Sequence, residues 1–170
     1  RRNNAEIARY EAGRTAKNSK RTDRKIKKAE ARNARLDQVT KEIAALRDSD
    51  QLYGITISNG NDGNGAFVYN EEAGTMDVLI PADSPLGLFA HELKHAYQFE
   101  KGELGATPLG EGWNFLYDIT DERAAYARGK MFGHYVSDWE DRDSYKGLPS
   151  QSITVYSVNG FTPFSNEYTY

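Results

Sequence analysis

Residues 84–100 read S-P-L-G-L-F-A-H-E-L-K-H-A-Y-Q-F-E and decide the interpretation of this chain. The segment places His91, Glu92 and His95 in the order H-E-x-x-H. Its flanks predict a helix, because Ser84 suits an N-cap, Pro85 suits the first helical position, and no strong helix breaker follows. Two of the three histidines of the chain lie in this helix.

The H-E-x-x-H spacing matches the chemistry of a metal hydrolase. Residues four apart share one helix face, so His91 and His95 can bind one metal ion. Glu92 lies about 100° around the helix, where it can take a proton from a water molecule on that metal. Zinc suits two imidazoles and lowers the pKa of bound water to roughly 7. The pattern predicts a Zn²⁺ site with Glu92 as general base.

The same helix is apolar around most of its circumference, which predicts burial within the domain. Only a narrow polar stripe interrupts the apolar surface, formed by Lys94, Gln98 and Lys101. Buried imidazoles need polar partners, and a metal ion is a suitable partner for two of them.

A third protein ligand is needed for a tetrahedral site that keeps one position open. The metzincin continuation is excluded, because Gln98 and Lys101 stand where that motif has Gly and His. Residues 118–126 predict a second helix with Asp118 as its cap and acidic residues in its first turn. Glu122 in that turn is the favoured third ligand, and His134, just beyond the predicted helix end, is the rival.

Composition limits the remaining possibilities. The 170 residues suffice for one sizeable domain, and the absence of cysteine excludes disulfides and thiolate zinc sites. No apolar run is long enough to span a bilayer. The first residue is Arg1, so we expect an excised or processed part of a longer chain.

Charge divides the chain into two segments. Residues 1–50 hold 15 Lys and Arg against 8 Asp and Glu, a net charge of +7 that leaves −10 on the remainder. The strong helix formers of residues 5–47 predict one or two helices. We expect a basic helical linker or stalk at 1–50, rather than a nucleic-acid-binding segment, because Tyr10 is its only aromatic residue.

Short apolar runs between turn residues predict strands at 53–58, 66–69 and 75–80, with a hairpin turn at 59–65. These strands predict an antiparallel meander whose edge can accept an extended peptide. Residues 102–112 read as a glycine-rich loop. A further strand is expected at 153–158.

Two segments resemble a known family. L-F-A-H-E-L-K-H-A-Y-Q-F-E-K-G-E at 88–103 and Y-D-I-T-D-E-R-A-A-Y-A-R-G-K at 117–130 are similar to effector-type zinc metallopeptidases. That family comprises type III secreted effector proteases and the metallopeptidase domains of bacterial polymorphic, RHS-like toxins. The resemblance covers about residues 52–132.

This resemblance implies a gluzincin-like hydrolase with zinc on His91, His95 and Glu122 and with Glu92 as general base. It also implies a protein or peptide substrate, secretion or delivery into a target cell, and an immunity protein as a possible partner. One position departs from the thermolysin-like pattern: Tyr126 replaces the Asp that orients a ligand histidine. Asp118 and Asp121 are the candidates for that orienting role.

Together these observations predict an α+β, zincin-like domain at 51–170. We expect a small antiparallel meander packed on a buried H-E-x-x-H helix, with a second helix that supplies the third ligand. The candidates for stabilising the reaction's oxyanion are Tyr126, His134 and Tyr135. The alternative function is a metal-stabilised binding module without catalysis.

Overall fold

The computed structural model describes residues 2–59, 64–109, 112–146 and 148. The chain divides into two compact units, residues 1–44 and residues 45–170. The strand expected at 153–158 lies outside the described residues. Among the residues that are described, no helix is both long enough and apolar enough to cross a membrane.

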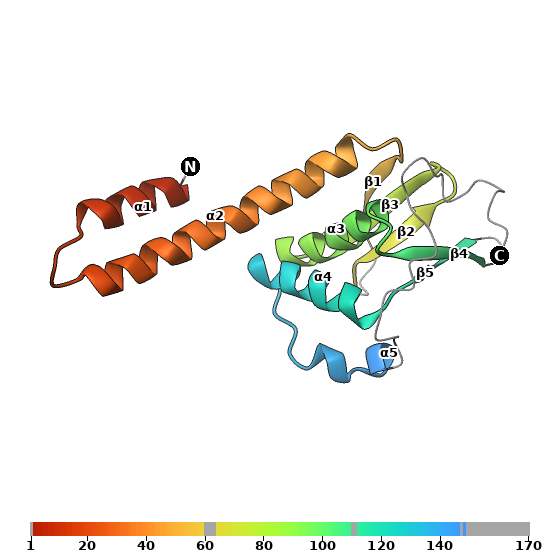
Figure 1. The fold of residues 1–170 in the computed structure, drawn as a ribbon. Helices are drawn as coiled ribbons and strands as arrows, with labels where there is room; N and C mark the ends of the chain where they lie inside the picture. Colours follow the sequence, from red (N-terminus) through yellow and green to blue (C-terminus); the bar gives the residue numbers. More distant parts are fainter. Residues whose placement is uncertain (1, 60–63, 110–111, 147, 149–170) are drawn as a thin grey trace. The chain divides into compact units, whose positions relative to one another are not determined.

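The first unit is a helical hairpin built from α1 (Arg2–Ala12) and most of α2 (Ser19–Arg47). Side chains connect the two helices, with Asn33 Nδ2 donating to Asn4 Oδ1 over 2.8 Å. Arg32 donates to Asn3 Oδ1 over 3.3 Å and lies 3.7 Å from Glu6. The predicted basic segment is therefore two helices, which lie antiparallel in Figure 1.

The second unit begins with a three-stranded mixed sheet, formed by β1 (Tyr53–Ser58), β2 (Ala66–Asn70) and β3 (Thr75–Pro81). The strand order is β1-β3-β2, with β1 parallel and β2 antiparallel to β3. The expected antiparallel meander is therefore wrong, and residues 59–65 do not close a hairpin between paired strands.

The physical reason for this order is burial. β3 is buried at five of its seven positions, whereas Ile55 and Ile57 of β1 are about 60% exposed. The strand with the most to bury takes the centre, where it has a neighbour on each side.

Helix α3 (Leu86–Glu100) packs on β2 and β3 and forms the core with them. Pro85 is its N-cap, with an extended backbone and no side-chain cap, so the expected Ser84 cap is wrong. The buried core residues are Leu46, Phe67, Met76, Val78, Ile80, Leu88, Ala96, Phe99, Leu104 and Ala106.

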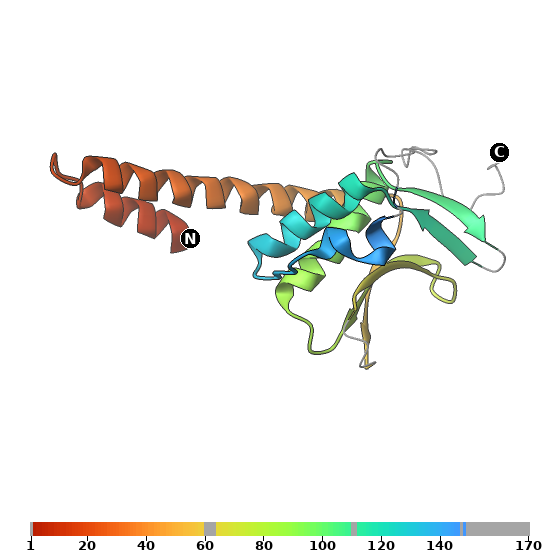
Figure 2. The same ribbon diagram turned by 90° about the horizontal axis from the view of Figure 1, so that it is seen from below.

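A two-stranded hairpin follows α3, formed by β4 (Gly105–Leu109) and β5 (Gly112–Leu116). The loop expected at 102–112 is therefore wrong, since most of that range belongs to these strands. Its glycines and Pro108 suggested a loop, but a two-stranded ribbon has edge positions that tolerate proline. Figure 2 shows the hairpin as a ribbon separate from the three-stranded sheet.

Helix α4 (Ile119–Met131) lies beside α3 in Figures 1 and 2 and has extensive contacts with it. A short 3₁₀ helix, η1 (Trp139–Asp141), and α5 (Asp143–Lys146) follow. The observed architecture is thus α+β, with α3 packed on a small mixed sheet and α4 packed against α3.

Candidate metal centre

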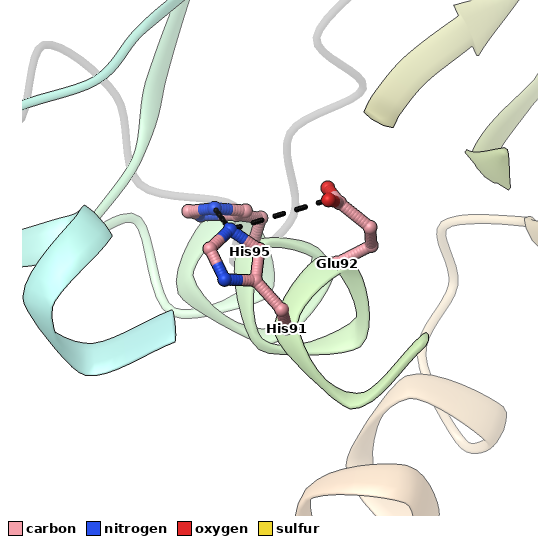
Figure 3. Close-up of side chains that lie close together, drawn as sticks. All are labelled: His91, Glu92 and His95. Atoms are coloured by element: carbon pink, nitrogen blue, oxygen red, sulfur yellow. Dashed lines mark hydrogen bonds and ion pairs between the residues drawn. The ribbon is translucent and has the colours of Figure 1, made fainter. Parts of the chain in front are cut away.

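The two histidines of the H-E-x-x-H segment converge on successive turns of α3. His91 Nε2 and His95 Nε2 are 3.1 Å apart, and the residues are 5% and 1% exposed. Figure 3 shows both rings side by side with Glu92 nearby. The donor atoms of His91, Glu92 and His95 lie within 4.8 Å of one another, so this group could hold a metal ion.

Glu92 is a buried carboxyl beside the imidazoles. Its Oε1 lies 4.0 Å from His91 Nε2, and the residue is 6% exposed. Burial raises the pKa of Glu92 to about 7, an effect that His91 opposes and Glu122 reinforces. A carboxyl with a pKa near neutrality suits a group that takes up and returns a proton.

Glu122 approaches the histidines from the first turn of α4. Asp118 caps this helix by accepting from the backbone N–H groups of Thr120 and Asp121, and Asp121 returns the interaction to Asp118 N. The predicted Asp118 cap is confirmed. This capping box fixes the residue at which α4 begins. The start of the helix in turn sets the direction in which the Glu122 side chain points.

The two oxygens of Glu122 reach one histidine each. Oε2 lies 3.5 Å from His91 Nε2, and Oε1 lies 3.7 Å from His95 Nε2. Oε2 is buried and finds no hydrogen-bond partner within the described part of the chain. His134, the rival ligand, lies farther away, with its ring centroid 6.4 Å from that of His91.

The spacing of these donor atoms fits a small tetrahedral metal ion. Zinc binds imidazole nitrogen at about 2.0–2.1 Å, which places two ligands of a tetrahedral ion roughly 3.3 Å apart. The observed separations of 3.1, 3.5 and 3.7 Å lie close to this value. An unpartnered buried carboxylate oxygen fits the same conclusion, since such a group needs a counter-charge.

Burial also controls the charge of the site. It lowers the pKa of His95 to about 3, with His91 acting in the same direction. The His95 ring is therefore neutral across the physiological range, and a neutral imidazole is the form that binds metal.

Gln98 supports His95 and was not predicted to have this role. It belongs to the polar stripe of α3, yet it is only 2% exposed. Gln98 Oε1 lies 2.9 Å from His95 Nδ1, and Gln98 Nε2 donates to the Asp121 carbonyl over 3.1 Å. Its position three residues after His95 could have indicated this contact, because residues three apart are neighbours on a helix.

The expected orienting residues have different roles. The Asp118 and Asp121 side chains form the capping box of α4, and neither is the partner of His95 Nδ1. Only the backbone carbonyl of Asp121 contributes to the support of His95, through Gln98.

Aromatic rings surround the histidines. The Tyr126 ring packs edge-to-face on His91 at 4.5 Å, and the Tyr117 ring packs in the same manner on His95 at 4.8 Å. His134 stacks at 6.5 Å from Tyr126, whereas Tyr135 is 73% exposed and lies under Lys130. Two of the three predicted oxyanion candidates, Tyr126 and His134, therefore lie beside His91. Tyr117, which was not predicted from the sequence, lies beside His95.

The hydroxyl groups of these tyrosines remain protonated at neutral pH. Burial raises the pKa of Tyr117 and of Tyr126, and the neighbouring carboxylates Glu92 and Glu122 act in the same direction. The Tyr126 hydroxyl lies 3.1 Å from that of Tyr145. A protonated hydroxyl beside the site can donate a hydrogen bond to developing negative charge.

Comparison with known proteins gave no match: no protein-family model, curated protein or solved structure matches the chain.

Proposed function

We propose that residues 45–170 form a zinc-dependent endopeptidase that hydrolyses peptide bonds in a target protein. The supporting observation is the set of three buried donors, His91, His95 and Glu122, whose atoms are 3.1–3.7 Å apart around one point. Nitrogen and carboxylate donors in this combination, with one position left open, are the ligands of catalytic zinc sites in peptidases.

In the proposed reaction, His91, His95 and Glu122 hold Zn²⁺. Zinc supplies a Lewis acid that polarises a carbonyl and lowers the pKa of water. Glu92 takes the proton of the attacking water and returns it to the leaving amine, for which its pKa of about 7 is well matched. Tyr126, Tyr117 and His134 are the neighbouring donors available to stabilise the oxyanion.

The position of β2 favours an extended peptide as substrate. β2 is an outer strand of the sheet, and Gly65 immediately before it lies against Glu92. A peptide added along the free edge of such a strand is held by main-chain hydrogen bonds. That arrangement would bring a peptide carbonyl towards the site without requiring a particular side chain.

The biological role that we propose is that of a bacterial secreted toxin or effector, acting on a protein in a target cell. Support for this part comes from the resemblance of residues 88–103 and 117–130 to effector-type metallopeptidases. An immunity protein that blocks the site is the corresponding partner.

A second candidate function is a metal-stabilised binding module without catalysis. The observation that favours it is the burial of the site: His91, Glu92, His95 and Glu122 are each less than 10% exposed. A metal enclosed in this way would join α3 to α4 and strengthen the fold, as structural zinc sites do.

The two functions are separated by a peptide-cleavage assay on the zinc-loaded chain with a mixed peptide library. The peptidase predicts cleavage that Glu92→Gln abolishes while zinc stays bound. Glu71→Gln, the same change at an exposed turn residue, is the matched control and should leave cleavage unchanged. Cleavage that persists in Glu92→Gln would contradict the proposed mechanism, and zinc binding with no cleavage in the wild type would favour the binding module.

A further inference from the structure

The Gln98 side chain is one of the most deeply buried polar groups of the second unit, at 2% exposed. It bridges two elements of the site, since Oε1 faces His95 Nδ1 at 2.9 Å and Nε2 faces the Asp121 carbonyl at 3.1 Å. Asp121 immediately precedes Glu122, so this amide connects the histidine helix to the residue beside the third donor.

The Asp121 carbonyl determines which way the Gln98 amide is oriented. A carbonyl oxygen can only accept a hydrogen bond, so the amide NH₂ group must face it. The Gln98 oxygen therefore faces His95 Nδ1. Because an amide oxygen also only accepts, His95 Nδ1 must carry the proton and donate it.

The tautomer of His95 follows from this chain of donors and acceptors. The neutral imidazole is the form of histidine that binds metal. A neutral imidazole with its proton on Nδ1 has a free electron pair on Nε2. That is the atom 3.1 Å from His91 Nε2 and 3.7 Å from Glu122 Oε1.

We propose that Gln98 is a positioning residue for the metal site: it holds His95 in the Nδ1–H form with Nε2 ready to bind metal, and it ties the start of α4 to α3. The effect of Gln98 on metal binding rests on the proposed function. The tautomer of His95 is a property of the metal-free protein and is independent of that function.

The proposal also assigns the proton of His91. Two free electron pairs 3.1 Å apart would repel each other, so without metal His91 Nε2 carries a proton and donates it to His95 Nε2. Metal binding through Nε2 would require His91 to release this proton, whereas His95 would need no change.

The first test is the tautomer of each histidine in the metal-free full chain, measured by ¹⁵N NMR of the imidazole rings. The spectrum is simple because the chain has three histidines, and His134→Asn and His91→Asn together assign all three rings. We expect the proton on Nδ1 in His95 and on Nε2 in His91. A proton on Nε2 of His95 would overturn the proposal.

The second test is Zn²⁺ affinity after Gln98→Met, which keeps the side-chain length and removes both hydrogen bonds. Loss of an orienting partner typically weakens metal binding 10- to 100-fold. Gln38→Met is the matched control, since Gln38 lies in α2 and donates to Glu42 there; it should keep wild-type affinity. Unchanged affinity in Gln98→Met would overturn the proposal.

These tests separate this inference from the proposed function. If wild-type His95 has the Nδ1–H tautomer but the chain binds no Zn²⁺, the zinc peptidase fails and the role of Gln98 in orienting His95 stands. If Gln98→Met does not fold, the wild-type tautomer alone decides. If wild type and Gln98→Met bind Zn²⁺ with equal affinity, the proposed role of Gln98 is wrong, but the proposed metal site is unaffected.

Discussion

Gly87 in α3 and Gly129 in α4 meet backbone to backbone, and neither position has room for a side chain. A Cβ atom on Gly87 would lie 2.7 Å from the Gly129 carbonyl oxygen, and one on Gly129 would lie 2.9 Å from the Gly87 oxygen. This close approach brings Glu122 of α4 within reach of the histidines of α3. Gly87 and Gly129 are thus the small residues that allow the two helices to approach this closely.

Gly87→Ala should destabilise the protein and weaken metal binding, because the new methyl group forces α3 away from α4. The position is crowded further by the backbone nitrogen of His134, which would lie 2.5 Å from the new methyl carbon. We expect a loss of about 1–3 kcal/mol in the free energy of unfolding, as is usual for overpacking. Urea denaturation measures this change.

The matched control is Gly13→Ala, where the nearest atom to the new methyl group lies at an ordinary distance of 3.5 Å. This variant should keep both its stability and its metal affinity. Equal stability of Gly87→Ala and Gly13→Ala would show that the contact between α3 and α4 is looser than described.

Glu122→Ala should remove bound zinc, whereas His134→Ala should retain it. The reason is distance: the Glu122 oxygens lie 3.5 and 3.7 Å from the histidine Nε2 atoms, while the centroid of the His134 ring lies 6.4 Å from that of His91. Elemental analysis of the purified and reconstituted variants measures the zinc content per chain. The opposite result, with zinc lost only in His134→Ala, would assign the third ligand to His134.

Glu92→Gln should stabilise the metal-free protein above neutral pH. The folded protein holds the Glu92 proton more tightly than the unfolded chain, because burial raises its pKa from 4.5 to about 7. The ionised carboxylate therefore costs stability as pH rises through this window, by up to about 3 kcal/mol. Below about pH 4.5 both states are protonated, and the difference between variant and wild type should disappear.

The free energy of unfolding of both proteins is measured by urea denaturation at pH 4, 6 and 8, with a chelator present. His95 provides an internal control, because its folded pKa is lowered and both proteins should lose stability as pH falls below about 6.5. Equal stability of wild type and Glu92→Gln at pH 8 would mean that Glu92 is better solvated than its burial indicates.

Gly65→Ala should impair catalysis while leaving zinc in place. A Cβ atom on Gly65 would lie 2.7 Å from Glu92 Cγ and 2.9 Å from its Oε1, so the carboxylate must move. Displacing a general base by about 1 Å can cost roughly 100-fold in rate. A fall in kcat with one zinc retained per chain is the expected result, and Gly13→Ala is again the control. An unchanged kcat would place the working position of Glu92 away from Gly65.

The amino-acid sequence by itself determined the local elements of this protein. The H-E-x-x-H spacing places His91 and His95 on one helix face, and Asp118 with its acidic first turn starts α4. The three strands of the sheet begin where their apolar runs begin. Each of these features depends on residues within one or two turns of each other, which is the range over which sequence patterns act.

Tertiary structure decided everything that depends on which surfaces meet. The order β1-β3-β2 follows from the burial of β3 and not from the turn residues, and the hairpin of β4 and β5 forms despite Pro108. In the sequence Gln98 is only one member of a polar stripe, yet in the structure it is enclosed because α4 offers it the Asp121 carbonyl. Burial and pairing arise between segments distant in the chain, so no local pattern encodes them.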